Sequence, residues 1–533
     1  MVFALLAYAA VCSAELEDYT PIDTRMCWGI AELDGSRFVT DCAGAEVLRL
    51  DSNGAILARM STALNEQPSA PRGLCAVGGS LAYADGASGT IVFVDPQDMR
   101  IVRSVQAPGP NPQGLAFDGQ FLWCADDDRD CLYRLDAKSA KVLAEVAAPS
   151  YTPRGMTWSA DTLWVLDSWD LCAYRVDPST GAVEASVYLP PGRPRALLAS
   201  AGRLLVTLAD KNALVDLPYV EGPGYILSLP VEAHVTATCT VRPRGDEKAP
   251  GGARLLVAIP PTTIRQSVEN LTPFPNGCSP ETDDFGQSVF VWDVPALDRG
   301  RSFSCGWEAD VRVWAIRYHP RPCIASEANG AIDSAYLRGD QYVTMDAPAV
   351  RALADGLTGL EPLRCLLALR DRIFERMSYK LDGTWDPADV CLERGTGSCS
   401  EYTCIFAGAA RGMGIPVRFA GATMLRPPQD PNQPSLERLD TVWHRWQEAH
   451  VEGYGWLPID STRDDYAQGP PFRRRDFLAV GPGVLVCSRG PLGEGTALGV
   501  DYRRRLVQPE GQKNAWRIDA AALWRLQALT PWT

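Results

Sequence analysis

The chain has 533 residues, of which 46% are apolar and 22% charged, and its formal net charge is -14. This length is too great for one hydrophobic core and predicts three or four domains of roughly 150 residues each. The acidic balance argues against a nucleic-acid-binding protein, because affinity for phosphate needs clustered Lys and Arg. The one short basic run, at 473–475, is predicted to be a solvated turn.

The first fourteen residues, MVFALLAYAAVCSA, form an apolar stretch that ends in small residues before the acidic ELED. This pattern is typical of the apolar core and cleavage site of a secretory signal, although the basic residues that usually precede them are missing. We therefore predict a signal peptide at 1–14 and a secreted or periplasmic protein, with a mis-assigned start codon as the alternative. No later stretch reaches the roughly 18 apolar residues that span a bilayer, so we expect no membrane span.

The sixteen cysteines fit an exported protein, since an oxidising compartment favours structural disulfides. Removal of Cys12 with the signal would leave an odd number, so that one thiol stays unpaired or pairs with another molecule. The chain has no CxxC pair and only four histidines, which argues against a metal cluster. We expect no metal and no cofactor.

A repeat organises the first 220 residues. The segments PRGL, PQGL, PRGM and PRAL begin at residues 71, 112, 153 and 194, a constant spacing of 41 residues. Aspartates recur in register, and a shift of 44 residues adds an earlier copy, which makes about five copies between 27 and 218. Each copy holds short apolar runs between turn residues, which predicts four-stranded blades and hence a β-propeller over 20–222. The copies resemble, in architecture, propellers of the quinoprotein-like and glutamine-cyclotransferase-like kind.

The acidic run DDDRD at 126–130 lies between Cys124 and Cys131. A solvated hairpin loop explains this run, because the recurring aspartates of the repeat are typical turn formers. A cation site is the alternative. The two cysteines could bridge the hairpin. Since propellers present loops from all blades around one axis, we also consider a partner or ligand bound to the propeller.

The pattern stays β-like over 223–325 but loses the 41-residue period. Runs such as ARLLVAIPP and QSVFVWDV are of strand length, and Pro- and Gly-rich turns separate them. We predict an immunoglobulin-like β-sandwich here. At 347–380 the apolar residues change to helical spacing, which indicates a domain boundary near 325.

The stretch GTGSCSEYTC around Cys399 opens with glycines and continues with apolar residues at helical spacing, from Tyr402 to Met413. Cys399 is therefore predicted at or just before the first turn of a helix, where the positive end of the helix dipole stabilises a thiolate. Cys404 lies inside the same helix, so we expect it to pack or to form a disulfide.

A thiolate nucleophile needs an imidazole base and an acceptor that orients the imidazole. The sequence TVWHRWQEAHVEGYGWLPID alternates as a strand, turns at EGYG and continues to Asp460. A hairpin of this form can bring the Asp460 carboxylate beside His444. Cys399 is therefore the candidate nucleophile, and His444 with Asp460 beside it is the candidate base.

Four motifs in this region resemble the transglutaminase-like superfamily. They are GSC at 397–399, GIPVR at 414–418, HRWQE at 444–448 and GWLPID at 455–460. The resemblance covers about 330–505 and implies an α+β, papain-like core at 326–505, with 506–533 as a C-terminal tail. The expected fold is thus multidomain: an all-β propeller and a β-sandwich, followed by this α+β core.

The resemblance implies acyl transfer through a thioester on Cys399, with the backbone N–H of Cys399 donating to the oxyanion. Arg445 stands where the family commonly has a small residue. No side chain that completes the oxyanion hole is evident, and Trp385 is the candidate. Trp446 and Glu448 are expected around the site, as substrate contacts or as support for the triad.

The expected substrate is a peptide or protein amide, cleaved by water in the manner of a peptidase or amidase. Transamidation of protein glutamine is the alternative, because the triad is the same and only access of an amine acceptor differs. A second hypothesis is a propeller-based binding protein with a degenerate core. A propeller enzyme of the cyclotransferase type ranks last, because no nucleophile or acid–base pair repeats in the blades.

Overall fold

A computed structural model describes residues 19–63, 68–244, 248–319, 332–381, 383, 385–428, 435–462, 476–493, 495–510 and 515–529. The chain divides into two compact units, Met1–Leu229 and Pro230–Leu529. The predicted signal at 1–14, the basic run at 473–475 and the boundary near 325 lie outside the described residues. None of the described helices is both long enough and apolar enough to cross a membrane.

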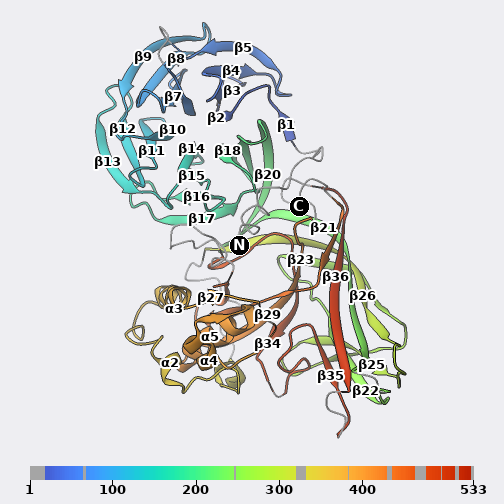
Figure 1. The fold of residues 1–533 in the computed structure, drawn as a ribbon. Coiled ribbons are helices and arrows are strands. Elements are labelled where there is room, and N and C mark those ends of the chain that lie inside the picture. The colour runs from blue at the N-terminus through green and yellow to red at the C-terminus, as the bar shows by residue number, and fades with distance from the viewer. Residues whose placement is uncertain are drawn as a thin grey trace. The chain divides into compact units, whose positions relative to one another are not determined.

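Within its described residues the first unit is a β-propeller of five four-stranded blades, as predicted (Figure 1). Blade one holds β2 (Cys27–Leu33), β3 (Ser36–Asp41), β4 (Glu46–Leu50) and β5 (Ile56–Ser61). Blade two holds β6 (Pro71–Val77), β7 (Ser80–Asp85), β8 (Thr90–Asp95) and β9 (Arg100–Gln106). Blade three holds β10 (Pro112–Phe117), β11 (Phe121–Asp126), β12 (Cys131–Asp136) and β13 (Val142–Ala147). Blade four holds β14 (Pro153–Ser159), β15 (Thr162–Asp167), β16 (Cys172–Val176) and β17 (Val183–Tyr188).

The fifth blade joins the two ends of the propeller. It holds β18 (Pro194–Ser200), β19 (Arg203–Leu208), β20 (Ala213–Gly222) and the early strand β1 (Tyr19–Pro21), which pairs antiparallel with β20. The ring closes at the axis as well, because β18 contacts β2. There the Thr207 hydroxyl donates a hydrogen bond to the Trp28 carbonyl at 2.6 Å.

Glycines at the axis explain the repeated PxG pattern. The first strand of each blade contacts the first strand of the next, and Gly73, Gly114 and Gly155 lie at these contacts. A Cβ at any of them would clash with backbone atoms of the following blade, and the same holds for Gly29 in blade one. The close approach of neighbouring backbones therefore requires glycine at this position.

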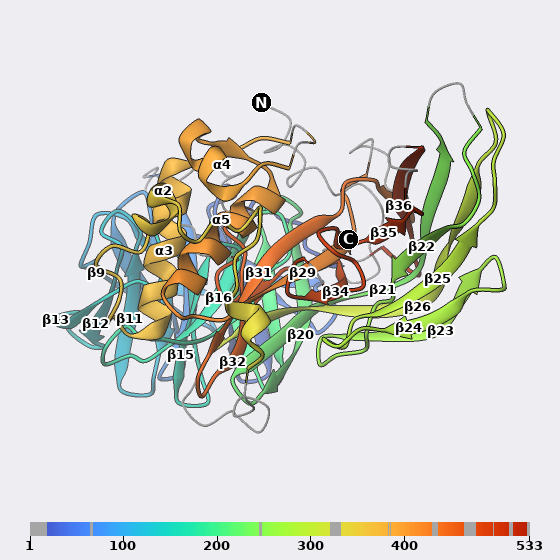
Figure 2. The same cartoon turned by 90° about the horizontal axis from the view of Figure 1, so that it is seen from below.

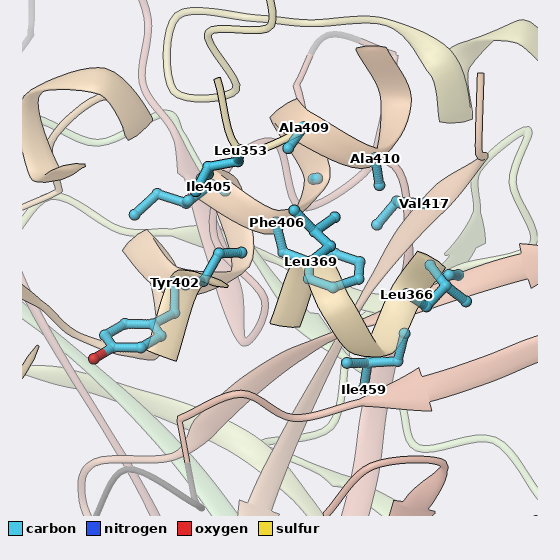
Figure 3. Packing of buried hydrophobic residues seen from close by; sticks show 14 of the residues in the cluster. Leu353, Leu366, Leu369, Tyr402, Ile405, Phe406, Ala409, Ala410, Val417 and Ile459 are labelled. Carbon is cyan, nitrogen blue, oxygen red and sulfur yellow. The ribbon is translucent and has the colours of Figure 1, made fainter. Parts of the chain in front are cut away.

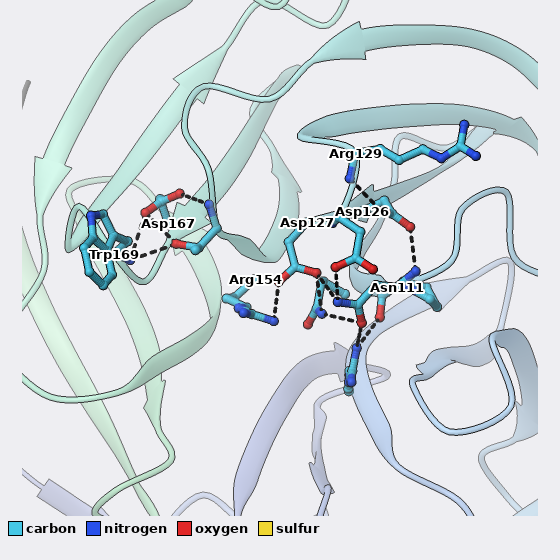
Figure 4. Close-up of polar contacts among 12 residues, drawn as sticks. Asn111, Asp126, Asp127, Arg129, Arg154, Asp167 and Trp169 are labelled. Carbon is cyan, nitrogen blue, oxygen red and sulfur yellow. Dashed lines mark hydrogen bonds and ion pairs between the residues drawn. The ribbon is translucent and has the colours of Figure 1, made fainter. Parts of the chain in front are cut away.

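The recurring aspartates end the second strand of their blades and hold the turn that follows. Asp126 accepts hydrogen bonds from the backbone N–H groups of Asp128 and Arg129, and its other oxygen accepts from Asn111. Asp167 does the same in the next blade (Figure 4). These side chains are turn formers, as predicted. In the described part of the chain, no group of His, Cys, Asp and Glu could hold a metal ion.

The predicted disulfides are absent from the described residues, where no S–S bond joins any of the fourteen cysteines. In the hairpin of β11 and β12, Cys124 lies opposite Tyr133 and Cys131 lies opposite Asp126, so the two thiols are not cross-strand partners. Burial raises the pKa of most of these thiols, to about 12 for Cys239. A buried thiol that stays protonated reacts poorly, so these cysteines behave as small apolar core residues.

The second unit begins as a β-sandwich. One sheet contains β21 (Tyr225–Pro243), β23 (Gln266–Phe274) and β26 (Phe303–Tyr318). The other contains β22 (Ala253–Ala258), β24 (Ser279–Thr282) and β25 (Ser288–Val294). The buried indole N–H of Trp307, on β26, donates to the Ala258 carbonyl at 2.8 Å and so links the two sheets.

The end of the chain belongs to this sandwich. β35 (Arg504–Val507) pairs with β22, and β36 (Trp516–Leu526) pairs with β21 along eleven residues (Figure 2). Two short strands extend the same sheet, β30 (Glu437–Asp440) on β36 and β33 (Ala479–Val480) on β26. The region 506–533, which we predicted as a tail, thus contributes a central strand.

The transglutaminase-like region is an α+β layer structure. Its helices are η1 (Ser334–Leu337), α2 (Pro348–Arg351), α3 (Pro362–Arg376), α4 (Ala388–Arg394) and α5 (Cys399–Gly412). An antiparallel sheet runs in the order β32 (Gly455–Ile459), β31 (His444–Val451), β29 (Val417–Met424) and β34 (Val484–Gly490). The two-residue strands β27 (Ser378–Tyr379) and β28 (Thr396–Gly397) pair in parallel before α5.

Helix α5 is buried between α3 and the sheet. Figure 3 shows its apolar side chains among those of α3, β29 and β32: Tyr402, Ile405, Phe406, Ala409 and Ala410 with Leu366, Leu369, Val417 and Ile459. The predicted helical spacing after Cys399 is confirmed. Since α5 is enclosed by packing, its first residue has a defined place against β31.

Candidate active site

Cys399 is the first residue of α5, which confirms the predicted helix start. Ser398 is the N-cap, and Glu401 completes a capping box by accepting a hydrogen bond from the Ser398 backbone N–H at 2.7 Å. The thiol is 4% exposed and lies at the end of the helix where the N–H groups have no partner within the helix. This end carries partial positive charge, which favours a thiolate.

His444 and Asp460 are brought together by a hairpin, as predicted. β31 and β32 pair antiparallel, and His444 begins β31 while Asp460 directly follows β32. The imidazole Nε2 lies 2.6 Å from the Asp460 Oδ2. The other carboxylate oxygen accepts from the Thr462 backbone N–H at 3.0 Å and from its hydroxyl at 2.7 Å. These bonds hold the carboxylate in the position that orients the imidazole.

The imidazole also interacts with the Cys399 thiol, because α5 packs directly on β31. Burial alone would raise the pKa of Cys399, but the hydrogen bond and charge of His444, with the N–H and charge of Arg445, lower it. Burial alone would likewise lower the pKa of His444, but Asp460 and Cys399 raise it to about 9. The two shifts favour a thiolate and an imidazolium at neutral pH.

Arg445 is a buried cation beside this pair, at 1% exposure. Its guanidinium lies over the rings of Tyr502 and Trp385, at 4.3 and 4.9 Å from the ring centres, and donates to the Val500 carbonyl at 2.6 Å. No carboxylate among the described residues forms an ion pair with it. Its charge lowers the pKa of Cys399 and also that of the buried Asp501 carboxyl.

Trp446 and Glu448 were both predicted near the site, but only one of the two side chains contacts the triad. The Trp446 ring stacks on His444, with ring centres 6.0 Å apart, and so lies at the site. The Glu448 carboxylate is buried and instead bonds Arg418 at 2.6 Å and Arg489 at 3.4 Å. Arg418 and Glu448 face each other in the register of β29 and β31. This ion pair joins the last residue of GIPVR to the last residue of HRWQE.

Trp385, the candidate oxyanion donor, lies against Arg445 and edge-on to Tyr342, with ring centres 6.2 Å apart for the two aromatics. It lines a small pocket with Ser400 and Glu401, on the α5 side of the site. The Trp385 indole thus contacts Arg445, which lies at the site. No described hydrogen bond orients the indole N–H toward the place of a substrate carbonyl oxygen.

The sequence analysis assigned no role to three residues that lie at the site. Glu401 could have been found, since Ser398 followed by Glu401 is the sequence pattern of a capping box. Arg445 was noticed only as a departure from the family pattern. Tyr502, 6% exposed, packs on Gly421 and next to Arg445, and its position depends on the return of the chain a hundred residues after Cys399. No local pattern predicts that contact.

Comparison with known proteins agrees with the motifs. Residues 351–461 match the family model of the transglutaminase-like superfamily. No curated protein matches the chain.

Solved structures that match parts of the chain include a proposed cysteine protease from Cytophaga hutchinsonii, 13% identical over 57% of this chain and 100% of that one, with a TM-score of 0.37. They also include glutaminyl cyclase from Myxococcus xanthus, 15% identical over 38% of this chain and 94% of that one, with a TM-score of 0.33. Virginiamycin B lyase from Staphylococcus aureus is 18% identical over 38% of this chain and 76% of that one, with a TM-score of 0.27. The family match and the motifs together show that the chain contains a domain of the transglutaminase-like superfamily.

Proposed function

We propose that the chain is a thiol enzyme that hydrolyses amide bonds of peptides or proteins, with Cys399, His444 and Asp460 as its catalytic triad. One observation carries the proposal. The thiol, at the first residue of a buried helix, interacts with an imidazole that is itself 2.6 Å from a fixed carboxylate. This is the set of groups that acyl transfer through a thioester needs.

In the first half-reaction the Cys399 thiolate attacks the carbonyl carbon, and a C–S bond forms while the carbonyl electron pair moves to oxygen. The backbone N–H of Cys399 is available to stabilise this oxyanion. The His444 imidazolium then donates its proton to the departing amine, the C–N bond breaks and a thioester remains. Since this step needs protonated His444, whose pKa is about 9, we expect turnover to fall as pH rises above about 9.

In the second half-reaction neutral His444 takes a proton from water, and the resulting hydroxide adds to the thioester carbon. Breaking of the C–S bond releases a carboxylic acid and returns the thiolate and the imidazolium. Asp460 stabilises the imidazolium in both halves. If a primary amine enters in place of water, the same steps form a new amide, so the acceptor decides between hydrolysis and transamidation.

The test is Cys399→Ala with Cys404→Ala as the matched control, since both thiols are buried in α5. We expect Cys399→Ala to lose at least ~10³-fold in kcat/KM on a peptide amide substrate, while Cys404→Ala keeps activity. In wild type, brief alkylation at neutral pH should label Cys399 before every other cysteine. Retained turnover in Cys399→Ala would overturn the proposal.

A competition experiment separates the two acceptors. Wild-type enzyme is incubated with a peptide substrate, with and without a primary amine at millimolar concentration, and the products are identified by mass spectrometry. Hydrolysis predicts that the acid product dominates in both samples. A dominant amine adduct would assign the chain to transamidation instead.

We also propose export, which rests on the apolar first fourteen residues. Cleavage after Ala14 would leave β1, which begins at Tyr19, in the mature chain. Sequencing the N-terminus of the native protein tests this, and a mature chain that still begins at Met1 would contradict it.

A further inference from the structure

The second residue of PRGL and of its copies has no role in the proposed function. In the five blades this position is occupied by Trp28, Arg72, Gln113, Arg154 and Arg195. These side chains meet across blade boundaries. The guanidinium groups of Arg72 and Arg195, from the two blades beside blade one, lie 5.6 and 4.4 Å from the centre of the Trp28 ring.

Hydrogen bonds continue this ring through blades two to four. Arg72 donates to the Asn111 side-chain oxygen and to the Pro112 carbonyl. The Arg154 guanidinium forms an ion pair with Asp127 at 2.5 Å. Figure 4 shows Asp127 between Asn111 and Arg154, and its Oδ1 accepts from the Asn111 amide at 2.6 Å. The residues from all five blades therefore form one connected polar cluster.

Positive charge exceeds negative charge in this cluster. Of its three arginines, Arg154 has a carboxylate partner and Arg72 bonds to neutral oxygens. Arg195 forms no hydrogen bond or ion pair with any described residue, and its described contact is the Trp28 ring. Burial and the nearby charges of Arg154 and Arg193 lower the pKa of Arg195 to about 10. Such an unpaired, partly buried cation is unfavourable unless an anion accompanies it.

Unmet hydrogen-bonding groups gather at the same place. In the described residues, the buried Nε atoms of all three cluster arginines lack a partner, as do the Trp28 indole N–H and the Gln113 side-chain oxygen. Gln113 is completely buried and Trp28 is 7% exposed. Buried polar atoms normally have partners, so four unmet donors point to an acceptor supplied from outside the chain. The three arginines are half-buried and hence accessible to a ligand.

We propose that Arg72, Arg154 and Arg195, together with the Trp28 indole N–H, form an oxyanion-binding site of the propeller, which takes a carboxylate or phosphate group of a small ligand. A guanidinium matches the two oxygens of either group with paired hydrogen bonds. Of the nearby carboxylates, Asp127 pairs with Arg154, and Asp128 and Asp167 act on the same guanidinium, whereas Arg195 forms no ion pair with a described residue. The site does not depend on the chemistry proposed for Cys399.

The test is isothermal titration calorimetry on the full chain at low, constant ionic strength, with inorganic phosphate in one arm and citrate in the other. We compare wild type with Arg195→Gln and with the matched control Arg129→Gln. Arg129 is exposed, and its side chain points away from Asp127 and Arg154 in Figure 4. Both variants remove one positive charge from the same unit.

We expect wild type to bind at least one of the two oxyanions with a Kd below about 10 mM. Arg195→Gln should weaken that binding at least about tenfold, as expected for loss of a charge-assisted hydrogen-bonding partner, and Arg129→Gln by less than about twofold. The better ligand of the two arms tells a carboxylate from a phosphate. Arg195→Gln should fold, since its substitution removes an unpaired cation, and a thermal melt checks this.

Two results would overturn the proposal. One is the absence of binding by wild type in both arms up to that concentration. The other is equal weakening by Arg195→Gln and Arg129→Gln, which would mean that only net charge matters.

Discussion

Arg445 is the residue through which this chain departs from the common family pattern, and its surroundings explain why a large cation fits. Phe419, Trp385 and Tyr502 surround the guanidinium with aromatic rings at 6.0 Å or less from their centres. Aromatic faces attract a cation, so the three rings help to accommodate the charge inside the protein.

The first prediction concerns this charge. Arg445→Met should raise the pKa of the Cys399 thiol, because the cation stabilises the thiolate and methionine does not. The measurement is the rate of iodoacetamide alkylation of Cys399 against pH, whose midpoint should shift upward. Arg372→Met is the control, since Arg372 bonds the carbonyls of Leu353 and Asp355 and does not act on Cys399. An unchanged midpoint in Arg445→Met would contradict the role assigned to the cation.

At the scale of elements, β29 and β31 are joined by a buried ion pair as well as by their backbone ladder. Glu448 lies between Arg418 and Arg489, and these two charges lower the pKa of its carboxyl although burial alone would raise it. The sheet that carries His444 on one strand is thus tied to the strand that follows α5. The arrangement of these strands therefore depends on the ion pairs of Glu448 with the two arginines.

The second prediction is that Glu448→Gln destabilises the second unit strongly. The substitution leaves two partly buried guanidinium groups without their carboxylate, which costs about 3–5 kcal/mol. Urea denaturation of the second unit measures the loss. Glu452→Gln, on the exposed turn of the next hairpin, is the control and should change stability by less than about 0.5 kcal/mol. A loss in Glu448→Gln as small as in the control would contradict the prediction.

The loss should also depend on pH. A carboxyl whose pKa is lowered by folding contributes stability above its unfolded pKa of about 4.3, and this contribution disappears as pH falls through the folded value. The difference between wild type and Glu448→Gln should therefore be full at neutral pH and shrink in acid.

At the scale of the whole molecule, both compact units use chain segments far apart in sequence. The propeller is completed by β1, which pairs with β20 nearly two hundred residues later, and by Ile22, whose N–H donates to the Asn212 carbonyl at 2.7 Å. The sandwich is completed by β35 and β36. Closure of this kind covers strand edges that would otherwise be unpaired.

The third prediction is that a chain beginning at residue 25 has a less stable propeller than a chain beginning at residue 15. Loss of β1 and of buried Ile22 should cost about 2–4 kcal/mol. The midpoint of the first unit in calorimetry should fall by roughly 5–15 °C. Alkylation of Cys399 in the second unit serves as the control and should be unchanged. Equal midpoints for the two chains would show that β1 is dispensable for closure.

The sequence by itself determined the features that depend on neighbouring residues. The 41-residue period predicted the blades because each copy repeats the same strands and turns, and the helical spacing after Cys399 placed that thiol at the start of α5. The pairing of His444 with Asp460 was within reach for the same reason, since a tight hairpin joins them. Motif spacing alone indicated the superfamily of residues 351–461.

Tertiary structure alone decided what depends on residues far apart in the chain. It formed no disulfide among the described cysteines, because their positions are set by packing and not by their number. It placed Tyr502 beside Arg445 and brought two arginines from different blades, Arg72 and Arg195, to the Trp28 ring. Such contacts carry no local signal: a repeat period tells where each blade begins, but only closure of the ring brings the same position of every blade to one axis.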